Sequence, residues 1–178
     1  MNPLERYEPL VDDPSAFRAA CEQPLPSVVR TNSLLVSPDR VRAAFDESGV
    51  PYEPVDWHEG LFRLPEGSPG RTWPHVHGWT HGQEEVSTLP AIALDAQPGD
   101  RVFDACAAPG SKTTQVAAAM DDAGTLVAND NNLGRLSALR HNAERLGVTN
   151  TIVTNQDARN FSMKPLAFDA FDRALVDA

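Results

Sequence analysis

A run of small residues stands where a short apolar strand gives way to a helix, and it is the part of the chain best suited to hold a ligand. The run is DACAAPGSKT, residues 104–113. Because its side chains are small, the backbone can approach a ligand closely, and the free amides at the start of the helix can hold an anion. In doubly wound folds such a loop lies at the carboxyl end of the first strand, where ligands bind. An ordinary strand-to-helix turn would show the same residues, because lone glycine patterns are weak signals.

The spacing within this run excludes two phosphate-binding signatures. A P-loop has Gly, four residues and then Gly-Lys-Ser/Thr. Here Ser111 separates Gly110 from Lys112, and Ala105 stands where the first glycine belongs. A dinucleotide fingerprint needs three glycines, whereas this run has one. The loop therefore favours an adenosyl ligand without phosphates.

Three acidic residues follow later apolar segments. Asp130 ends TLVAND, 24 residues after Cys106, where an acid in a Rossmann-like sheet reaches the ribose hydroxyls. It also stands in an NDNN run that would suit a turn. Asp157 follows TIVTN, where a carboxylate can accept a hydrogen bond from an adenine amine, and Asp177 follows FDRALV. Because ligands of such folds bind beyond the carboxyl ends of the strands, we expect these acids to face one crevice.

The elements that position these residues alternate between strand and helix. Strands are expected at RVFDA, TLVAN, TIVTN and FDRALVDA, and helices over 84–94 and 111–120. A further helix is expected to bury one face, made of Leu133, Leu136, Leu139, Ala143 and Leu146. This alternation predicts an α/β fold with a parallel, doubly wound sheet, of which four strands are present.

A smaller unit precedes the sheet. Residues 26–64 read as strand, helix, strand, strand, with Ser37 capping a helix that starts at Pro38 and ends at Gly49. Residues 1–25 read as an irregular or weakly helical lead-in, and the turn-rich stretch 65–74 as a linker. We therefore expect a small α+β domain over 26–74 and the α/β domain over 75–178.

Composition and charge narrow the function classes. The chain has 178 residues, of which 41% are hydrophobic, enough to build a core. No apolar run reaches bilayer length, and the N-terminus has no signal-peptide pattern, so a cytoplasmic protein is expected. The net charge of −10, with Lys112 and Lys164 the only lysines, is unusual for a phosphate-backbone binder. It fits either an ordinary acidic protein or a salt-adapted one.

Other polar and aromatic residues are open to two interpretations. No metal site is expected at His75, His77 and His81, with His58 upstream, because zinc needs three or four well-placed ligands, and these histidines read as surface or RNA-facing loop residues. Trp73 and Trp79 could stack on bases or pack internally. The arginines that could contact phosphates or lie free in solvent are Arg30, Arg40, Arg42 and Arg71.

Several segments resemble one family. DACAAPGSKTTQ resembles the first motif of the Nop/Sun family of S-adenosylmethionine-dependent RNA cytosine-5 methyltransferases. GQEEVSTLPAIALDAQPGDRVFD is similar to the segment that precedes that motif in the family, and VANDNNLGRLSALRHNAERLG to its second strand and helix. The unit around RTNSLLVS resembles its N-terminal RNA-contacting domain. The resemblance runs from about residue 27 to the end and is most specific over 83–135.

The resemblance implies a class I methyltransferase domain, S-adenosylmethionine as cofactor and RNA as partner, with transfer RNA the first substrate and ribosomal RNA the second. It implies that Asp130, with Arg135 nearby, would hold the ribose, that Asp157 would hold the adenine edge, and that Asp177 would sit between the cofactor and the target cytosine. The methionine part of the cofactor would be wrapped by Cys106, Ala107, Ala108, Pro109, Gly110, Ser111 and Lys112.

The cysteine chemistry is the main departure from the family. There the motif of Asp177 continues with Pro-Cys, and a later strand carries a second cysteine, whose thiolate adds to the cytosine ring. This chain ends at Ala178, so we expect it to be truncated before both and inactive alone. Cys106 is expected to pack in the cofactor loop, and Cys21 has no partner. A methyltransferase of small molecules or proteins, and a non-catalytic RNA- or cofactor-binding fragment, stay open as alternatives.

The acidic composition generates a prediction about salt. At molar salt the Debye length is about 3 Å, so repulsion among surface carboxylates is screened. If the net charge of −10 reflects a salt-adapted surface, the melting temperature should rise steadily from low ionic strength to the molar range. Thermal melts that stay flat or fall across this range would exclude salt adaptation.

Overall fold

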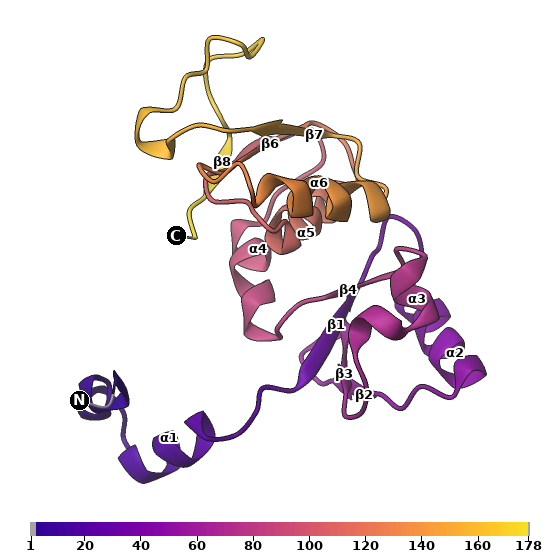
Figure 1. Ribbon diagram of the computed structural model, residues 1–178. Coiled ribbons are helices and arrows are strands. Elements are labelled where there is room, and N and C mark those ends of the chain that lie inside the picture. Colours follow the sequence, from indigo (N-terminus) through magenta and orange to yellow (C-terminus); the bar gives the residue numbers. More distant parts are fainter. Residues whose placement is uncertain (1–2, 178) are drawn as a thin grey trace.

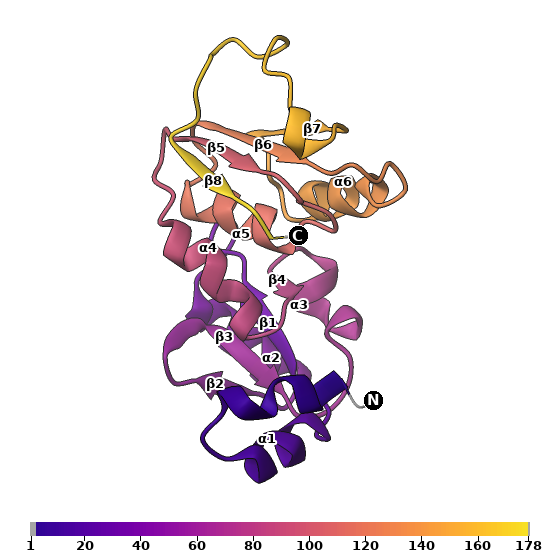
Figure 2. The same ribbon diagram turned by 90° about the vertical axis from the view of Figure 1, so that its left-hand side faces the viewer.

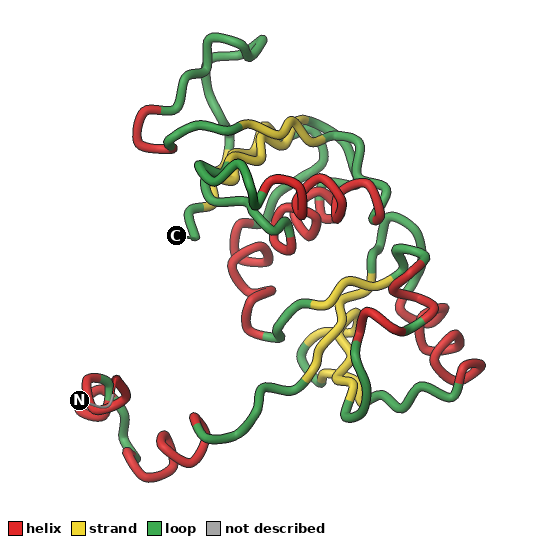
Figure 3. The backbone as a smooth tube through the Cα atoms, viewed as in Figure 1, coloured by secondary structure: helices red, strands yellow, loops and turns green. Residues whose placement is uncertain are grey.

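The structure, a computed structural model, describes residues 3–177 and consists of two four-stranded sheets with helices between them (Figures 1 and 3). The first sheet has the order β2-β3-β1-β4 and is antiparallel. Its strands are β1 (Ser27–Thr31), β2 (Glu53–Val55), β3 (His58–Leu64) and β4 (Thr80–Gly82).

Helix α2 (Pro38–Ser48) covers one face of the first sheet and forms as its sequence predicts. Ser37 Oγ accepts a hydrogen bond from the Arg40 amide, and Gly49 ends the helix with a φ of 64°. The buried side of the helix packs with strand residues in one core, made of Val29, Val41, Phe45, Phe62 and Leu64. An apolar stripe between two good caps therefore accounts for this helix.

The first sheet extends beyond the expected domain boundary at residues 74/75. Strand β4 pairs with β1, so that Thr31 lies opposite Thr80. The expected linker over 65–74 is also partly ordered, since it contains a short 3-10 helix (Pro69–Arg71) and the start of helix α3 (Trp73–Val76). The pairing satisfies the free edge of β1, whose backbone groups would otherwise lack partners.

The second sheet is parallel and has the order β7-β6-β5-β8. Its central strand β6 is buried, with Leu126, Val127 and Ala128 fully inaccessible, as is typical of parallel strands. The four predicted strands and the Rossmann-like fold are therefore confirmed. The strands are β5 (Arg101–Asp104), β6 (Thr125–Asn129), β7 (Thr151–Thr154) and β8 (Arg173–Leu175).

Three helices lie on the side of this sheet that faces the first sheet (Figures 1 and 2). They are α4 (Leu89–Leu94), α5 (Ser111–Ala119) and α6 (Leu136–Arg145). Within residues 3–177 the opposite face carries no α-helix, and there Phe103 packs against Phe161 and Phe171. The described part of the sheet is thus covered by helices on one face, whereas the doubly wound expectation places them on both.

Two helix predictions need correction. The helix expected over 84–94 is a 3-10 turn (Val86–Thr88) followed by the shorter α4. The helix expected to bury Leu133 begins only at Leu136, because a turn anchored by the Asn132 side chain precedes it. Leu133 is therefore 68% exposed, whereas the other four members of the predicted stripe are buried.

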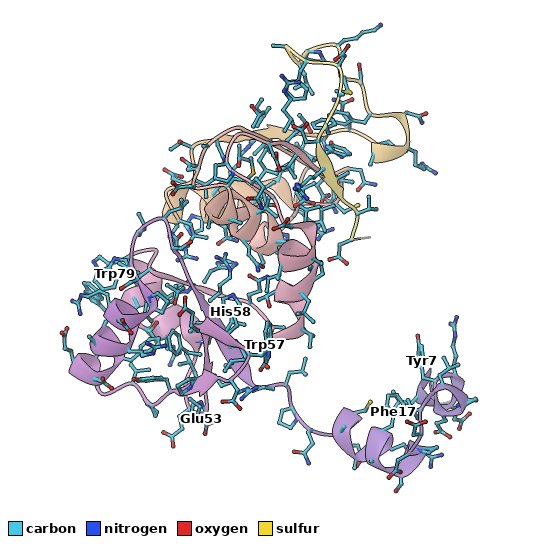
Figure 4. All side chains as sticks on the ribbon, turned by 180° about the vertical axis from the view of Figure 1, so that it is seen from behind. Tyr7, Phe17, Glu53, Trp57, His58 and Trp79 are labelled. Atoms are coloured by element: carbon cyan, nitrogen blue, oxygen red, sulfur yellow. The ribbon has the colours of Figure 1, made fainter. Side chains whose placement is uncertain are left out.

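The lead-in stands apart from both sheets in Figure 1. It contains two 3-10 helices (Pro3–Arg6 and Glu8–Leu10) and helix α1 (Pro14–Cys21). Asp13 caps α1 by accepting from two amides, and Tyr7 and Phe17 lie on this segment away from the rest of the chain (Figure 4). Among residues 3–177, no helix combines the length and apolar character that crossing a bilayer needs.

The turn before β4 lies against the end of α6, and this contact tests how the first sheet packs on the helices of the second. Gly78 has a φ of 73°, and a Cβ added there would lie 2.2 Å from the carbonyl oxygen of Arg145, at the end of α6. We expect Gly78→Ala to lower the free energy of unfolding by about 1–3 kcal/mol more than Gly67→Ala. Gly67 is the matched control, because its φ is 84° and nothing lies within 4 Å of the added Cβ. Equal losses in urea titrations would contradict the packing.

Candidate functional site

A cleft of about 1020 Å³ opens at the carboxyl ends of the parallel strands, where ligands bind in this type of sheet. Ten of the eleven site residues that the sequence predicts line it. They are Cys106, Ala107, Ala108, Pro109, Ser111, Lys112, Asp130, Arg135, Asp157 and Asp177. The structure thus brings the loop and the three acids together around one cavity.

Gly110 is the remaining predicted residue, and it lies behind the cleft wall. Its φ is 104°, and an added Cβ would lie 2.7 Å from Leu139 Cδ1. It precedes the first residue of α5 as the N-cap. Gly110 therefore turns the chain and lets α5 pack close to α6, so it shapes the loop without lining the cleft.

Asp130 ties the end of β6 to the loop. The carboxylate is buried and accepts from the Ala108 amide at 3.2 Å and from the Asn132 amide at 2.8 Å. The Arg135 guanidinium lies 3.5 Å from the same carboxylate and also donates to the Ala108 carbonyl oxygen. Asp130 and Arg135 are therefore fixed in orientation before any ligand enters, and they hold the loop in place.

The other two predicted acids are paired with cations. Asp157 accepts from the Arg159 guanidinium and backbone amide, which lower its pKa to about 2. Asp177 forms an ion pair with Lys112, with 2.7 Å between Nζ and Oδ2. The Lys112–Asp177 pair crosses from the start of α5 to the residues after β8, so it joins two walls of the cleft.

Two groups at the base of the cleft have raised pKa values. Burial raises the pKa of Asp104 to about 6, although its carboxylate accepts a 2.7 Å hydrogen bond from Thr113 Oγ1. Burial, together with the charges of Asp130 and Asp104, raises the pKa of the Cys106 thiol. Because a thiolate is the reactive form of cysteine, Cys106 is a poor nucleophile at neutral pH.

Four residues that precede the sheet also line the cleft, although the sequence prediction gives them no ligand role. They are Gly82, Gln83, Glu84 and Ser87. The Gln83 side chain is buried, accepts from Arg30 Nε at 3.0 Å and donates to Gln115 Oε1 at 2.8 Å. The sequence signal for these residues is the GQEEVS stretch, which resembles the family segment that precedes the first motif. By itself it contains no residue pattern that indicates a ligand.

Arg30 and His81 need correction, because they were expected at the surface. Arg30 is 4% exposed and donates to Gln83, to the Thr31 carbonyl oxygen and to Thr114. His81 is 6% exposed. Both lie between the first sheet and α5, so neither contacts solvent or a phosphate. Burial lowers the pKa of Arg30 to about 10, and its guanidinium stays charged at neutral pH.

The other histidines, tryptophans and arginines that the sequence singles out lie nearer the surface than Arg30 and His81. Trp73 is 46% exposed and stacks on His77, with 4.2 Å between ring centroids. The Arg40 guanidinium lies over the Trp79 ring at 4.9 Å. Within the described residues, no group of three or more His, Cys, Asp and Glu side chains is placed to hold a metal ion.

Comparison with known proteins identifies the family. Residues 91–178 match the family model described as 16S rRNA methyltransferase RsmB/F. The chain is 38% identical to ribosomal RNA small subunit methyltransferase F of Vibrio atlanticus, over 98% of this chain and 38% of that protein. It is 40% identical to the 26S rRNA (cytosine-C(5))-methyltransferase nsun-1 of Caenorhabditis elegans, over 91% of this chain and 24% of that protein.

The chain belongs to this Nop/Sun family of methyltransferases. It spans about 24–38% of the length of these two relatives. A methyltransferase homologue from Pyrococcus horikoshii matches with a TM-score of 0.72 and 29% identity, over 89% of this chain and 58% of that one. NSun6 from the same organism matches with a TM-score of 0.86 over 98% of this chain and 69% of that one; at 17% identity this likeness shows the shared fold.

The buried Asp104 generates a prediction about pH. Its folded-state pKa of about 6 lies above the unfolded value of about 3.9, so the folded state binds more protons between these two values. Its contribution to stability therefore falls as the pH rises from about 4 through 6. Relative to the wild type, Asp104→Asn should gain about 1–3 kcal/mol over this range, measured by urea unfolding at each pH.

Asp157→Asn is the control, because the pKa of Asp157 is lowered to about 2. The stability difference between this variant and the wild type should stay constant between pH 5 and 7. If the Asp104→Asn difference is equally constant, Asp104 does not have the raised pKa that burial of its carboxylate predicts.

Proposed function

We propose that the protein to which these residues belong transfers a methyl group from S-adenosylmethionine to carbon 5 of a cytosine in RNA. The observation that carries this is the single cleft in which the 104–113 loop meets Asp130, Asp157 and Asp177. Membership of the methyltransferase family supports the same function.

The charges of the cleft suit this cofactor better than a nucleotide with phosphates. S-adenosylmethionine carries a positive sulfonium and a positive ammonium, and its one anionic group is a carboxylate. Four aspartates line the cleft, whereas its basic side chains are Lys112, Arg135 and Arg159. All three basic side chains are paired with these acids. The lining of the cleft therefore offers no group of unpaired cations that could bind a polyphosphate. We therefore infer that the site is built for a cationic adenosyl ligand.

Each wall of the cleft suits one part of the cofactor. Asp130 would accept from the ribose hydroxyls, with Arg135 beside it, and Asp157 would accept from the adenine amine. The loop from Cys106 to Lys112 would enclose the methionine part, and Asp177 would separate it from the target base. When bound, the cofactor supplies the electrophilic methyl group, and these residues orient it and exclude water.

The nucleophile is a separate requirement. Carbon 5 of cytosine reacts with a methyl donor only after a thiolate adds to the neighbouring ring carbon. The raised pKa of Cys106 opposes such a role, and Cys21 lies in the lead-in, apart from the sheets (Figure 1). The family's second cysteine, on a strand later than the Pro-Cys motif, remains our prediction for the attacking thiol.

We place ribosomal RNA before transfer RNA as the substrate, which reverses the order inferred from the sequence. The support is that the two relatives compared above are named as rRNA methyltransferases. For the first unit we propose RNA contact, supported by the exposed Trp73–His77 stack, because aromatic faces at a surface can stack on unpaired bases. The target cytosine would have to leave its stack to reach the cleft.

The role of Asp130 is tested by its removal. In the full-length protein, Asp130→Ala should weaken S-adenosylmethionine binding by about 1.5–3 kcal/mol, because hydrogen bonds from the ribose to a charged acceptor are lost. Calorimetry provides the measurement. Asp56→Ala, at an exposed position outside the cleft lining, should bind like the wild type, and Cys106→Ser should show only a small loss. An unchanged affinity in Asp130→Ala would exclude the ribose role.

A further inference from the structure

Three side chains form a hydrogen-bonded series that runs from α6 through the first sheet to the cleft. Arg145 NH2 lies 2.9 Å from His81 Nδ1. His81 Nε2 lies 2.9 Å from Ser111 Oγ. Arg145 is itself held by the carbonyl oxygens of His75 and Thr80, at 2.6 and 3.1 Å from NH1. The series is therefore anchored at its α6 end.

The chemistry of arginine fixes the direction of every bond in this series. A guanidinium can only donate, so His81 Nδ1 must accept. A neutral imidazole that accepts at Nδ1 carries its proton at Nε2, and His81 therefore donates to Ser111 Oγ. Burial and the charges of Arg30 and Arg145 lower the pKa of His81 to about 3, so the ring is neutral at physiological pH.

Ser111 is left with a hydroxyl proton to donate. It is the first residue of α5 and lines the cleft. Its oxygen already accepts from His81, and no other protein group among residues 3–177 takes its proton. The hydroxyl is thus a donor whose acceptor must be water or a ligand in the cleft.

We propose that Ser111 donates this proton to the carboxylate of the cofactor's amino-acid part, and that His81 is a positioning residue that fixes the direction of the hydroxyl. The inference rests on the proposed use of S-adenosylmethionine. The sulfonium offers no acceptor and the ammonium can only donate, so the carboxylate is the group in that part of the cofactor that a fixed donor selects. The free amides at the start of α5 favour the same anion.

The arrangement gives the first sheet a role in cofactor recognition. His81 belongs to β4, which is paired with β1 and not with the parallel sheet. A side chain of the first unit therefore orients a group in the cofactor cleft of the second. If the two units separate, Ser111 loses its donor and its hydroxyl is free to rotate.

Calorimetry with two ligands tests this in the full-length protein. S-adenosylhomocysteine contains the amino-acid part, whereas 5′-methylthioadenosine lacks both its carboxylate and its ammonium. Ser111→Ala and His81→Phe should each weaken S-adenosylhomocysteine binding about 10-fold or more, with 5′-methylthioadenosine binding unchanged. The double variant should bind no more weakly than either single variant, because the two residues act through one bond.

His81→Gln is the conservative variant, because its amide offers an acceptor and a donor in place of the two ring nitrogens. It should restore binding of S-adenosylhomocysteine relative to His81→Phe, and thermal melts should check that each variant folds. Should His81→Phe fail to fold, Ser111→Ala and His81→Gln still distinguish a role in binding the cofactor carboxylate from a role in supporting the fold.

Three outcomes would overturn the inference. Ser111→Ala with unchanged affinity for S-adenosylhomocysteine would show that the hydroxyl does not contact the carboxylate. Equal losses for both ligands would show that the series only supports the fold. Failure of the wild type to bind either ligand would remove the proposed cofactor itself, and this result is distinguishable because it precedes any substitution.

Discussion

A buried guanidinium needs oxygen atoms around it, and the Arg30 side chain obtains them from both units of the fold. Gln83 and the Thr31 carbonyl oxygen come from the first sheet and the segment that follows it, and Thr114 comes from α5. No ion pair with a carboxylate involves Arg30 within residues 3–177. An unsatisfied buried charge is costly. The first sheet must therefore remain packed against α5, so that Arg30 keeps its hydrogen bond to Thr114.

This constraint carries through to the cleft. Once α5 is fixed against the first sheet, its first residues and the loop before it are fixed as well. Gln83 joins Arg30 to Gln115 of α5 and also lines the cleft. One side chain therefore contributes both to the contact between the first sheet and α5 and to the wall of the cleft. On the other side, Asp130 holds the Ala108 amide. The small-residue loop, which could otherwise adopt many conformations, is therefore held from two directions.

The sequence predicted what local patterns encode. The caps of α2 and the four parallel strands follow from residue types and spacing that act over a few positions. The meeting of three acids at one cleft follows because each acid stands after a strand, and parallel strands end at the same edge of the sheet. It did not predict the pairing of β4, because Thr80–Gly82 is a three-residue strand without periodicity. It also placed Arg30 and His81 at the surface, because their partners Thr114 and Ser111 lie 84 and 30 residues further along the chain.

Hydrogen exchange in the presence of S-adenosylhomocysteine tests the central claim most directly, namely that the 104–113 loop, the end of β6 and the segment before the sheet form one cofactor site. The cleft geometry predicts slower amide exchange on ligand addition in peptides that cover 83–87, 104–113 and 130–135, with no change in β2 and β3 of the first sheet. Protection confined to the first sheet, or no protection at ligand concentrations that saturate other methyltransferases, would contradict the account.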